Sequence, residues 1–140
     1  MFRNESVLSR LVLESCEANQ TPTLRTMTGG DKQMWTWQGN NLISKNGLAL
    51  EIKSGMFGKE AELVMNPMTE EENQQFELNE DIIVSKRDKT CVDVYYGMTD
   101  EGNFVWMFSQ NGSPAQKWRV VKKDGGNVSC MVFHNTFISN

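Results

Sequence analysis

Gln33-Met34-Trp35 is the first of three Gln-x-aromatic triplets in this chain of 140 residues, and the others are Gln74-Gln75-Phe76 and Gln116-Lys117-Trp118. The aromatic residues of successive triplets lie 41 and 42 residues apart. The apolar stretches that follow the first two triplets keep the same register, because Ile43 and Val84 each lie 8 residues beyond the triplet aromatic. A constant period of this size is typical of a fold built from repeats. The sequence therefore predicts three copies of one structural unit.

Short β-strand patterns, separated by turn residues, occupy the chain between the triplets. Leu48-Ala49-Leu50-Glu51-Ile52 alternates with a period of two after Asn46-Gly47, and Asn-Gly is a preferred hairpin turn. Thr90-Cys91-Val92-Asp93-Val94-Tyr95 is rich in residues that favour strands. No stretch requires a long helix. Because one strand pair cannot bury a face alone, we expect the repeats to share one core in an all-β, closed or nearly closed architecture.

Length and charge narrow the class of protein. A chain of this length most simply forms one domain. The net charge of −4 argues against a phosphate-binding surface, so nucleic acid is not an expected partner. No apolar run approaches the length of a membrane span, and Met1-Phe2-Arg3-Asn4-Glu5-Ser6 is polar where a signal peptide would be apolar. We expect no membrane insertion, and a protein that is cytoplasmic or released without a signal peptide; a mature form or fragment would instead be secreted.

Residues that could carry catalysis or bind metal are few. Cys16, Cys91 and Cys130 are odd in number and have no short paired spacing, which favours reduced thiols over a disulfide framework or a metal site. His134 is the single histidine, and no motif supplies it with a nucleophile. Neither a Gly-rich phosphate loop nor a metal-ligand spacing is present. We therefore expect no metal, no cofactor and no enzymatic activity.

Each triplet is preceded by a strand pattern with an acidic residue at an equivalent position, and these residues are Glu14, Glu51 and Asp93. The three triplets and their acids together resemble the ricin B-type lectins, also called the Gln-x-Trp carbohydrate-binding family. In that family the triplet aromatic mostly packs in the core, while the glutamine makes supporting hydrogen bonds. The resemblance implies a β-trefoil of twelve strands with pseudo-threefold symmetry and a non-enzymatic, glycan-binding function.

The resemblance covers residues 1–123, which we interpret as a single lectin-like domain. Its repeats span about residues 1–35, 36–76 and 77–118. Residues 124–140 have no place in the minimal trefoil. This C-terminal extension could begin a partial fourth repeat, cover one end of the barrel or form a subunit contact.

A sugar site needs an aromatic platform for the C–H face of the ring, and a carboxylate or amide for its hydroxyls. The resemblance assigns these roles most completely in the third repeat, to Asp93, Trp106 and Gln116. Ala115 stands where the family often has asparagine. The neighbouring residues Gln110 and Asn111 could supply that hydrogen bond instead. The structural alternative is that Trp106 packs inside the barrel and Asp93 only caps a turn.

The other two repeats depart further from the family pattern. The second repeat has Glu51 as its acid but Val64 at the platform position, so we expect a weak site or none. The first repeat has Glu14, with Thr23 or, if a gap is allowed, Arg25 in place of the aromatic. Degeneration to a structural repeat is the main interpretation there, and the alternative is that Glu14 and Arg25 serve a different polar ligand.

Three hypotheses for the function follow. The leading one is a carbohydrate-binding protein for galactose or N-acetylgalactosamine, which is the commonest preference that the resemblance implies. The second is a trefoil that recognises a protein, as a protease inhibitor or an adaptor does, in which the triplets serve packing alone. The third is the binding module of a larger toxin or enzyme. Since one site binds weakly, a homodimer would raise the avidity for glycans or glycoconjugates.

Overall fold

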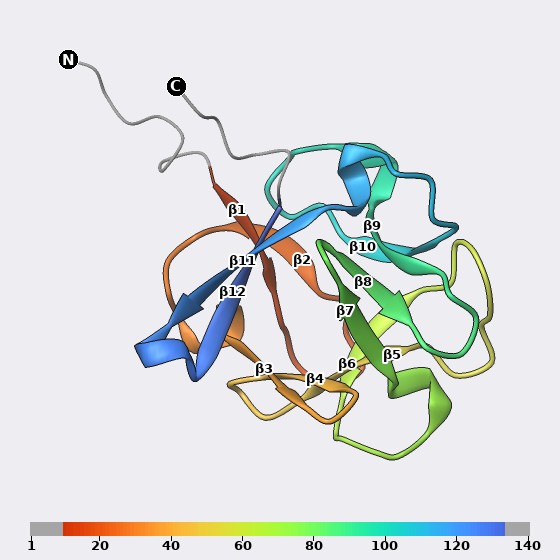
Figure 1. Cartoon of the computed structure of the whole chain (residues 1–140), viewed down its shortest axis with the longest axis horizontal. Coiled ribbons are helices and arrows are strands. Elements are labelled where there is room, and N and C mark those ends of the chain that lie inside the picture. The colour runs from red at the N-terminus through yellow and green to blue at the C-terminus, as the bar shows by residue number, and fades with distance from the viewer. Residues whose placement is uncertain (1–9, 134–140) are drawn as a thin grey trace.

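The computed structural model describes residues 10–133, and these residues form an all-β fold (Figure 1). In chain order the strands are β1 (Leu11–Glu14), β2 (Thr23–Thr26), β3 (Trp35–Gln38), β4 (Asn41–Ser44), β5 (Ala49–Ile52), β6 (Leu63–Asn66), β7 (Phe76–Asn79), β8 (Ile82–Ser85), β9 (Cys91–Val94), β10 (Val105–Phe108), β11 (Trp118–Lys123) and β12 (Val128–Phe133). The only helical elements within this range are 3-10 turns: η1 (Asp31–Gln33), η2 (Glu72–Gln74), η3 (Tyr95–Gly97), η4 (Pro114–Gln116) and η5 (Asp124–Gly126). None of the helical elements in this part of the chain is long and apolar enough to cross a membrane. The predicted all-β class is confirmed.

All strand pairs are antiparallel, and they connect into two sheets. The larger sheet has the order β2-β1-β12-β3-β4-β5-β6, with β11 paired to β12, and the smaller has the order β10-β9-β8-β7. Turn chemistry explains the hairpins. Between β4 and β5, Gly47 has φ = 95°, a left-handed conformation that glycine adopts without steric cost. The predicted Asn46-Gly47 turn therefore lies between paired strands.

The three triplets mark equivalent positions in three repeats. The triplet aromatics Trp35, Phe76 and Trp118 are buried in one common core. Trp35 Nε1 donates a hydrogen bond to the carbonyl of Leu13 at 3.0 Å, and this carbonyl lies on the strand that carries Glu14. Each triplet aromatic is the first residue of a strand that pairs with the next strand along the chain, which gives the hairpins β3-β4, β7-β8 and β11-β12.

The last hairpin explains the segment beyond residue 123. β12 pairs with β11, which precedes it in the chain. At Val132 it also pairs with Val12 of β1 (Figure 1). In the same way β4 pairs with β5, and β8 pairs with β9. β12 is thus the first strand of a fourth repeat, and it pairs with β1 as a starting strand of the first repeat would.

β12 belongs to the segment that we interpreted as a C-terminal extension, and it packs into the common core. Met131 and Phe133 are fully buried in the common core, and Phe133 lies 5.6 Å from Trp118 between ring centroids. Burial of two large side chains is a substantial part of the hydrophobic stabilisation. The strand order therefore continues the trefoil to Phe133, and residues 134–140 lie outside the described residues.

Three equivalent loops tie each repeat to the next one. The backbone N–H of the loop residue donates to a strand carbonyl of the next repeat around the barrel, in the pairs Asn19–Met65 (2.7 Å), Glu60–Met107 (2.5 Å) and, from the third repeat back to the first, Gly102–Leu24 (2.7 Å). All three loop residues have a positive φ, of 67°, 70° and 95° in this order. A left-handed residue at this position is thus part of the trefoil architecture, and it places the loop of the second repeat against β10 of the third.

Candidate functional site

In the third repeat, Gln116 forms hydrogen bonds both to Asp93 on β9 and to the loop before η4. Gln116 is fully buried. Its Nε2 donates to Asp93 Oδ2 at 3.0 Å and to the carbonyl of Ser109 at 2.8 Å. Its Oε1 accepts the backbone N–H of Asn111 at 3.0 Å. With both ends of the amide occupied, Gln116 positions Asp93 and lies beneath the surface.

The other two repeats contain the same arrangement, which we call the Gln–acid brace. Gln74 Nε2 donates to Glu51 Oε1 and to the carbonyl of Pro67, each at 2.9 Å, while its Oε1 accepts the N–H of Thr69 at 2.7 Å. Gln33 Nε2 donates to Glu14 Oε1 and to the carbonyl of Thr26, each at 2.9 Å, while its Oε1 accepts the N–H of Thr28 at 2.7 Å. The two backbone partners lie 7 and 5 residues before the glutamine in all three repeats, while the acid lies 23 residues before it in the second and third repeats and 19 in the shorter first repeat. The brace is therefore architecture, and it does not mark a binding site by itself.

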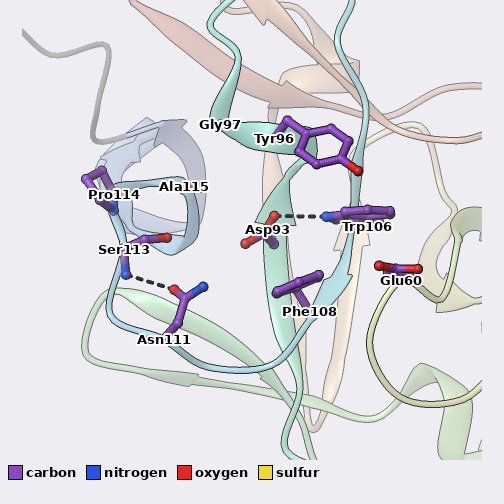
Figure 2. A pocket seen from close by; sticks show the side chains of 10 residues that line it. All are labelled: Glu60, Asp93, Tyr96, Gly97, Trp106, Phe108, Asn111, Ser113, Pro114 and Ala115. Atoms are coloured by element: carbon purple, nitrogen blue, oxygen red, sulfur yellow. Dashed lines mark hydrogen bonds between the residues drawn. The ribbon is translucent and has the colours of Figure 1, made fainter.

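The second carboxylate oxygen distinguishes the third repeat. Asp93 Oδ1 accepts a hydrogen bond from Trp106 Nε1 at 2.9 Å (Figure 2), because the two residues face each other across β9 and β10. In the second repeat the corresponding partner is an amide, since Asn66 Nδ2 donates to Glu51 Oε2 at 2.9 Å. Burial raises the pKa of the Asp93 carboxyl, and the hydrogen bonds from Gln116 and Trp106 act in the opposite direction.

A groove of about 440 Å³ opens over Asp93 and Trp106. We call it the third-repeat groove, and it is lined by Glu60, Asp93, Tyr96, Gly97, Trp106, Phe108, Asn111, Ser113, Pro114 and Ala115. Its volume lies in the range of about 300–1,000 Å³ that is usual for small-molecule sites. In Figure 2 the residues from Asn111 to Ala115 lie on one side of Asp93, while Trp106 and then Glu60 lie on the other. The carboxylate and the indole thus occupy the middle of the groove.

Aromatic rings flank Trp106. The Phe108 ring is stacked near it at 5.6 Å between centroids, and the Tyr96 ring lies 5.8 Å away on the other side in Figure 2. Tyr95 packs edge-on against the indole at 4.8 Å. Trp106 is half-buried and is not a member of the common core. The structure therefore supplies an aromatic surface beside a carboxylate, which is the combination that a sugar ring requires.

Tyr96 stands at the edge of this groove in an unusual conformation. Its side chain is 73% exposed and its φ is 50°. A left-handed conformation is uncommon for a bulky residue and costs of order 1–3 kcal/mol. The equivalent residues of the other repeats, Glu17 and Ser54, are not among the described residues with positive φ. Such local strain is often found at ligand sites.

The structure brings most of the predicted site residues together. Asp93, Trp106 and Asn111 line the groove, and Gln116 lies behind Asp93. Asn111 Oδ1 accepts the backbone N–H of Ser113 at 2.9 Å (Figure 2). Gln110 is outside the groove, because its Nε2 donates to the carbonyl of Lys89 at 2.9 Å.

Several lining residues did not emerge from the sequence. Phe108 could have been found, because it lies two residues after Trp106 and so shares its face of the strand. Tyr96 depends on the local turn η3. Glu60 comes from the second repeat and reaches the groove only through the packing of one repeat on the next.

In the described part of the chain, the side chains that could ligate a metal do not cluster, and the thiols are not paired. Within residues 10–133 no group of three or more His, Cys, Asp or Glu side chains could hold a metal ion. All three cysteines are free. Burial raises the pKa of Cys91 to about 12 and that of Cys16 to about 11, so both thiols are protonated at neutral pH. His134 lies outside the described residues.

Three braced repeats around one core define the class of this protein as a β-trefoil. The family model of the ricin-type beta-trefoil lectin domain matches residues 3–118, and the chain belongs to this family. Family membership supports carbohydrate binding. The predicted family and the predicted trefoil are confirmed.

Solved structures with the same fold include designed and natural proteins. The designed three-fold symmetric protein ThreeFoil is 23% identical with a TM-score of 0.69, and the match covers 79% of this chain and 94% of ThreeFoil. The C-half of the earthworm R-type lectin, solved in complex with GalNAc, is 16% identical with a TM-score of 0.62, covering 77% of this chain and 94% of that one. A mutant C-terminal domain of the earthworm lectin, solved with 6'-sialyllactose, is 18% identical with a TM-score of 0.63, covering 80% and 90%. At these identities the likeness shows the fold alone. Comparison with curated proteins gave no match.

Proposed function

We propose that this protein binds glycans through the third-repeat groove, with galactose or N-acetylgalactosamine as the preferred sugar. The observation that carries the proposal is the Asp93 carboxylate, held by Gln116 and Trp106 at the floor of a groove with aromatic walls. Each carboxylate oxygen has one protein donor, and an oxygen of this kind can accept a second hydrogen bond. Asp93 therefore accepts hydrogen bonds from hydroxyl groups of the sugar, while the sugar ring packs on the aromatic surface.

The GalNAc complex of the earthworm lectin supports the choice of sugar as a fold-level analogy. Asn111 and Ser113 take the place of the amide that Ala115 lacks, because both line the groove next to Asp93. No catalytic role is proposed for the groove.

The test compares Asp93→Asn with Glu51→Gln. Both changes remove the charge of a braced acid, but only Asp93 lies in the third-repeat groove. Calorimetric titration with galactose and N-acetylgalactosamine should show an affinity loss of roughly tenfold or more for Asp93→Asn, which corresponds to about 1.4 kcal/mol or more. Glu51→Gln should bind as the unmodified protein does.

Two results would contradict the proposal. The first is equal affinity of both variants, which would place any sugar site elsewhere. The second is a protein without measurable affinity for a broad set of sugars on a glycan array, together with a protein partner whose binding is unaffected by free sugar. That second result would favour the protein-recognition hypothesis.

A further inference from the structure

We propose that Glu60 makes the third-repeat groove selective for charge, so that it accepts neutral and cationic glycans and rejects anionic ones. This inference rests on the proposed function and names the class of glycan that the site takes. It begins from the composition of the groove. Two of the lining residues, Asp93 and Glu60, are acidic, and none of the described residues that line it is basic.

The Glu60 carboxylate is exposed and available to a ligand. The ion pairs formed among residues 10–133 do not include it. In Figure 2 its side chain extends beside Trp106, on the side opposite Asp93. A ligand on the indole therefore lies between two carboxylates, one buried and one at the rim. A cationic substituent next to aromatic faces and a carboxylate is stabilised by both.

The backbone holds Glu60 in this place. Its N–H donates to the carbonyl of Met107, and the N–H of Met107 donates to the carbonyl of Ala61 at 3.0 Å. Glu62 forms an isolated bridge with Trp106 one residue pair further along. The backbone of residues 60–62 thus pairs with the edge of β10, and this pairing holds Glu60 beside the groove.

Comparison of the three repeats shows that the architecture does not require an acid here. The equivalent loop residues are Asn19 in the first repeat and Gly102 in the third, and both asparagine and glycine suit a left-handed backbone. Glutamate is less suited to it, and it occurs in the one loop that borders a groove with Asp93 and Trp106. The loop architecture therefore does not require an acid at residue 60, and we assign its carboxylate to the ligand.

A charge series on one sugar ring tests the inference at neutral pH. The probes are 6-amino-6-deoxygalactose, galactose and galacturonic acid, with the corresponding glucose derivatives as a second series. The protein should bind the cationic sugar best and the acid worst. One charge at about 6 Å from Glu60 in water changes the affinity roughly threefold, and it does so in opposite directions for the cationic and the anionic sugar. In Glu60→Gln the ratio of cationic to anionic affinity should therefore fall by about tenfold. Affinity for the neutral sugar should stay within about twofold.

Two further variants control for folding and for net charge. Glu60→Asn copies the first repeat and suits the left-handed backbone, so it should fold and should lose the selectivity as Glu60→Gln does. Glu62→Gln removes the same charge from an exposed side chain that does not line the groove, and should keep most of the selectivity.

The outcomes separate the two proposals. Failure of the unmodified protein to bind any neutral sugar would overturn the proposed function and this inference with it. Binding of neutral sugars without a preference for charge would overturn the inference alone. So would a preference that persists in Glu60→Gln and Glu60→Asn, or a Glu60→Gln variant that loses neutral sugars as well.

Discussion

The second and third repeats contain the same Gln–acid brace beneath different surfaces. In the third repeat, Trp106 faces Asp93 and lines a groove. In the second, Val64 faces Glu51 and is only 3% exposed. The cavity near the second repeat, of about 430 Å³, is lined by the acidic residues at the start of η2 and just before it, and by Phe57 and Arg87. Glu51 does not line it.

This difference separates what the trefoil needs from what a ligand needs. The brace recurs in every repeat because a buried carboxylate must have hydrogen-bond donors, and because the glutamine also satisfies the loop backbone. The aromatic at the position facing the acid, by contrast, is free to vary. A Gln-x-aromatic triplet with its acid therefore predicts the fold, while the residue facing the acid predicts the site.

The largest expected effect is on stability, and it should be similar in both repeats. Gln74→Ala removes four side-chain hydrogen bonds and Gln116→Ala removes three, and each change leaves a buried carboxylate with one donor fewer. Each should lower the free energy of unfolding by about 2–4 kcal/mol in urea titrations. The neighbouring Gln75→Ala is the control and should change it by less than about 0.5 kcal/mol.

A large difference between these two variants would break the comparison. If Gln116→Ala left the unfolding free energy unchanged and Gln74→Ala lowered it, the third-repeat glutamine would be kept for the ligand and not for the fold. Circular dichroism of both variants would show whether the loss is confined to stability.

The next effect is on binding, when the third repeat is made to resemble the second. Trp106→Val removes the aromatic platform and the Nε1–H that orients Asp93. Affinity for the preferred sugar should fall roughly tenfold or more, which is about 1.4 kcal/mol. Trp37→Val is a matched control, because Trp37 is also partly buried but packs against the core away from the groove. Unchanged affinity in Trp106→Val, measured by calorimetry, would remove Trp106 from the site.

The sequence predicted the features that depend on spacing along the chain. The period of the triplets and the equivalence of Glu14, Glu51 and Asp93 are of this kind, while the roles of Asp93 and Trp106 came from the resemblance to the family. It did not predict β12 as the strand that pairs with β1, because the strand that completes the first repeat lies at the other end of the chain. It also missed Glu60, because the contribution of one repeat to the site of the next depends on their packing in three dimensions.

The smallest expected effect is the pH dependence that Asp93 gives to stability and to sugar affinity. Burial raises the pKa of the Asp93 carboxyl above its ordinary value of 3.8 in the folded protein, against the opposing hydrogen bonds from Gln116 and Trp106. Between the unfolded-state pKa and the raised folded-state pKa, the native state binds more protons than the unfolded state. The contribution of Asp93 to stability is therefore fully present below pH 3.8 and is lost as pH rises through the folded-state pKa. Sugar affinity should change in the opposite direction, because the ionised carboxylate is the better acceptor, and should begin to fall on acidification above pH 3.8. Calorimetric titration over a pH series should show this fall in the unmodified protein and its absence in the residual binding of Asp93→Asn. Affinity that stays constant down to pH 3.8 would mean that Asp93 does not accept a hydrogen bond from the sugar.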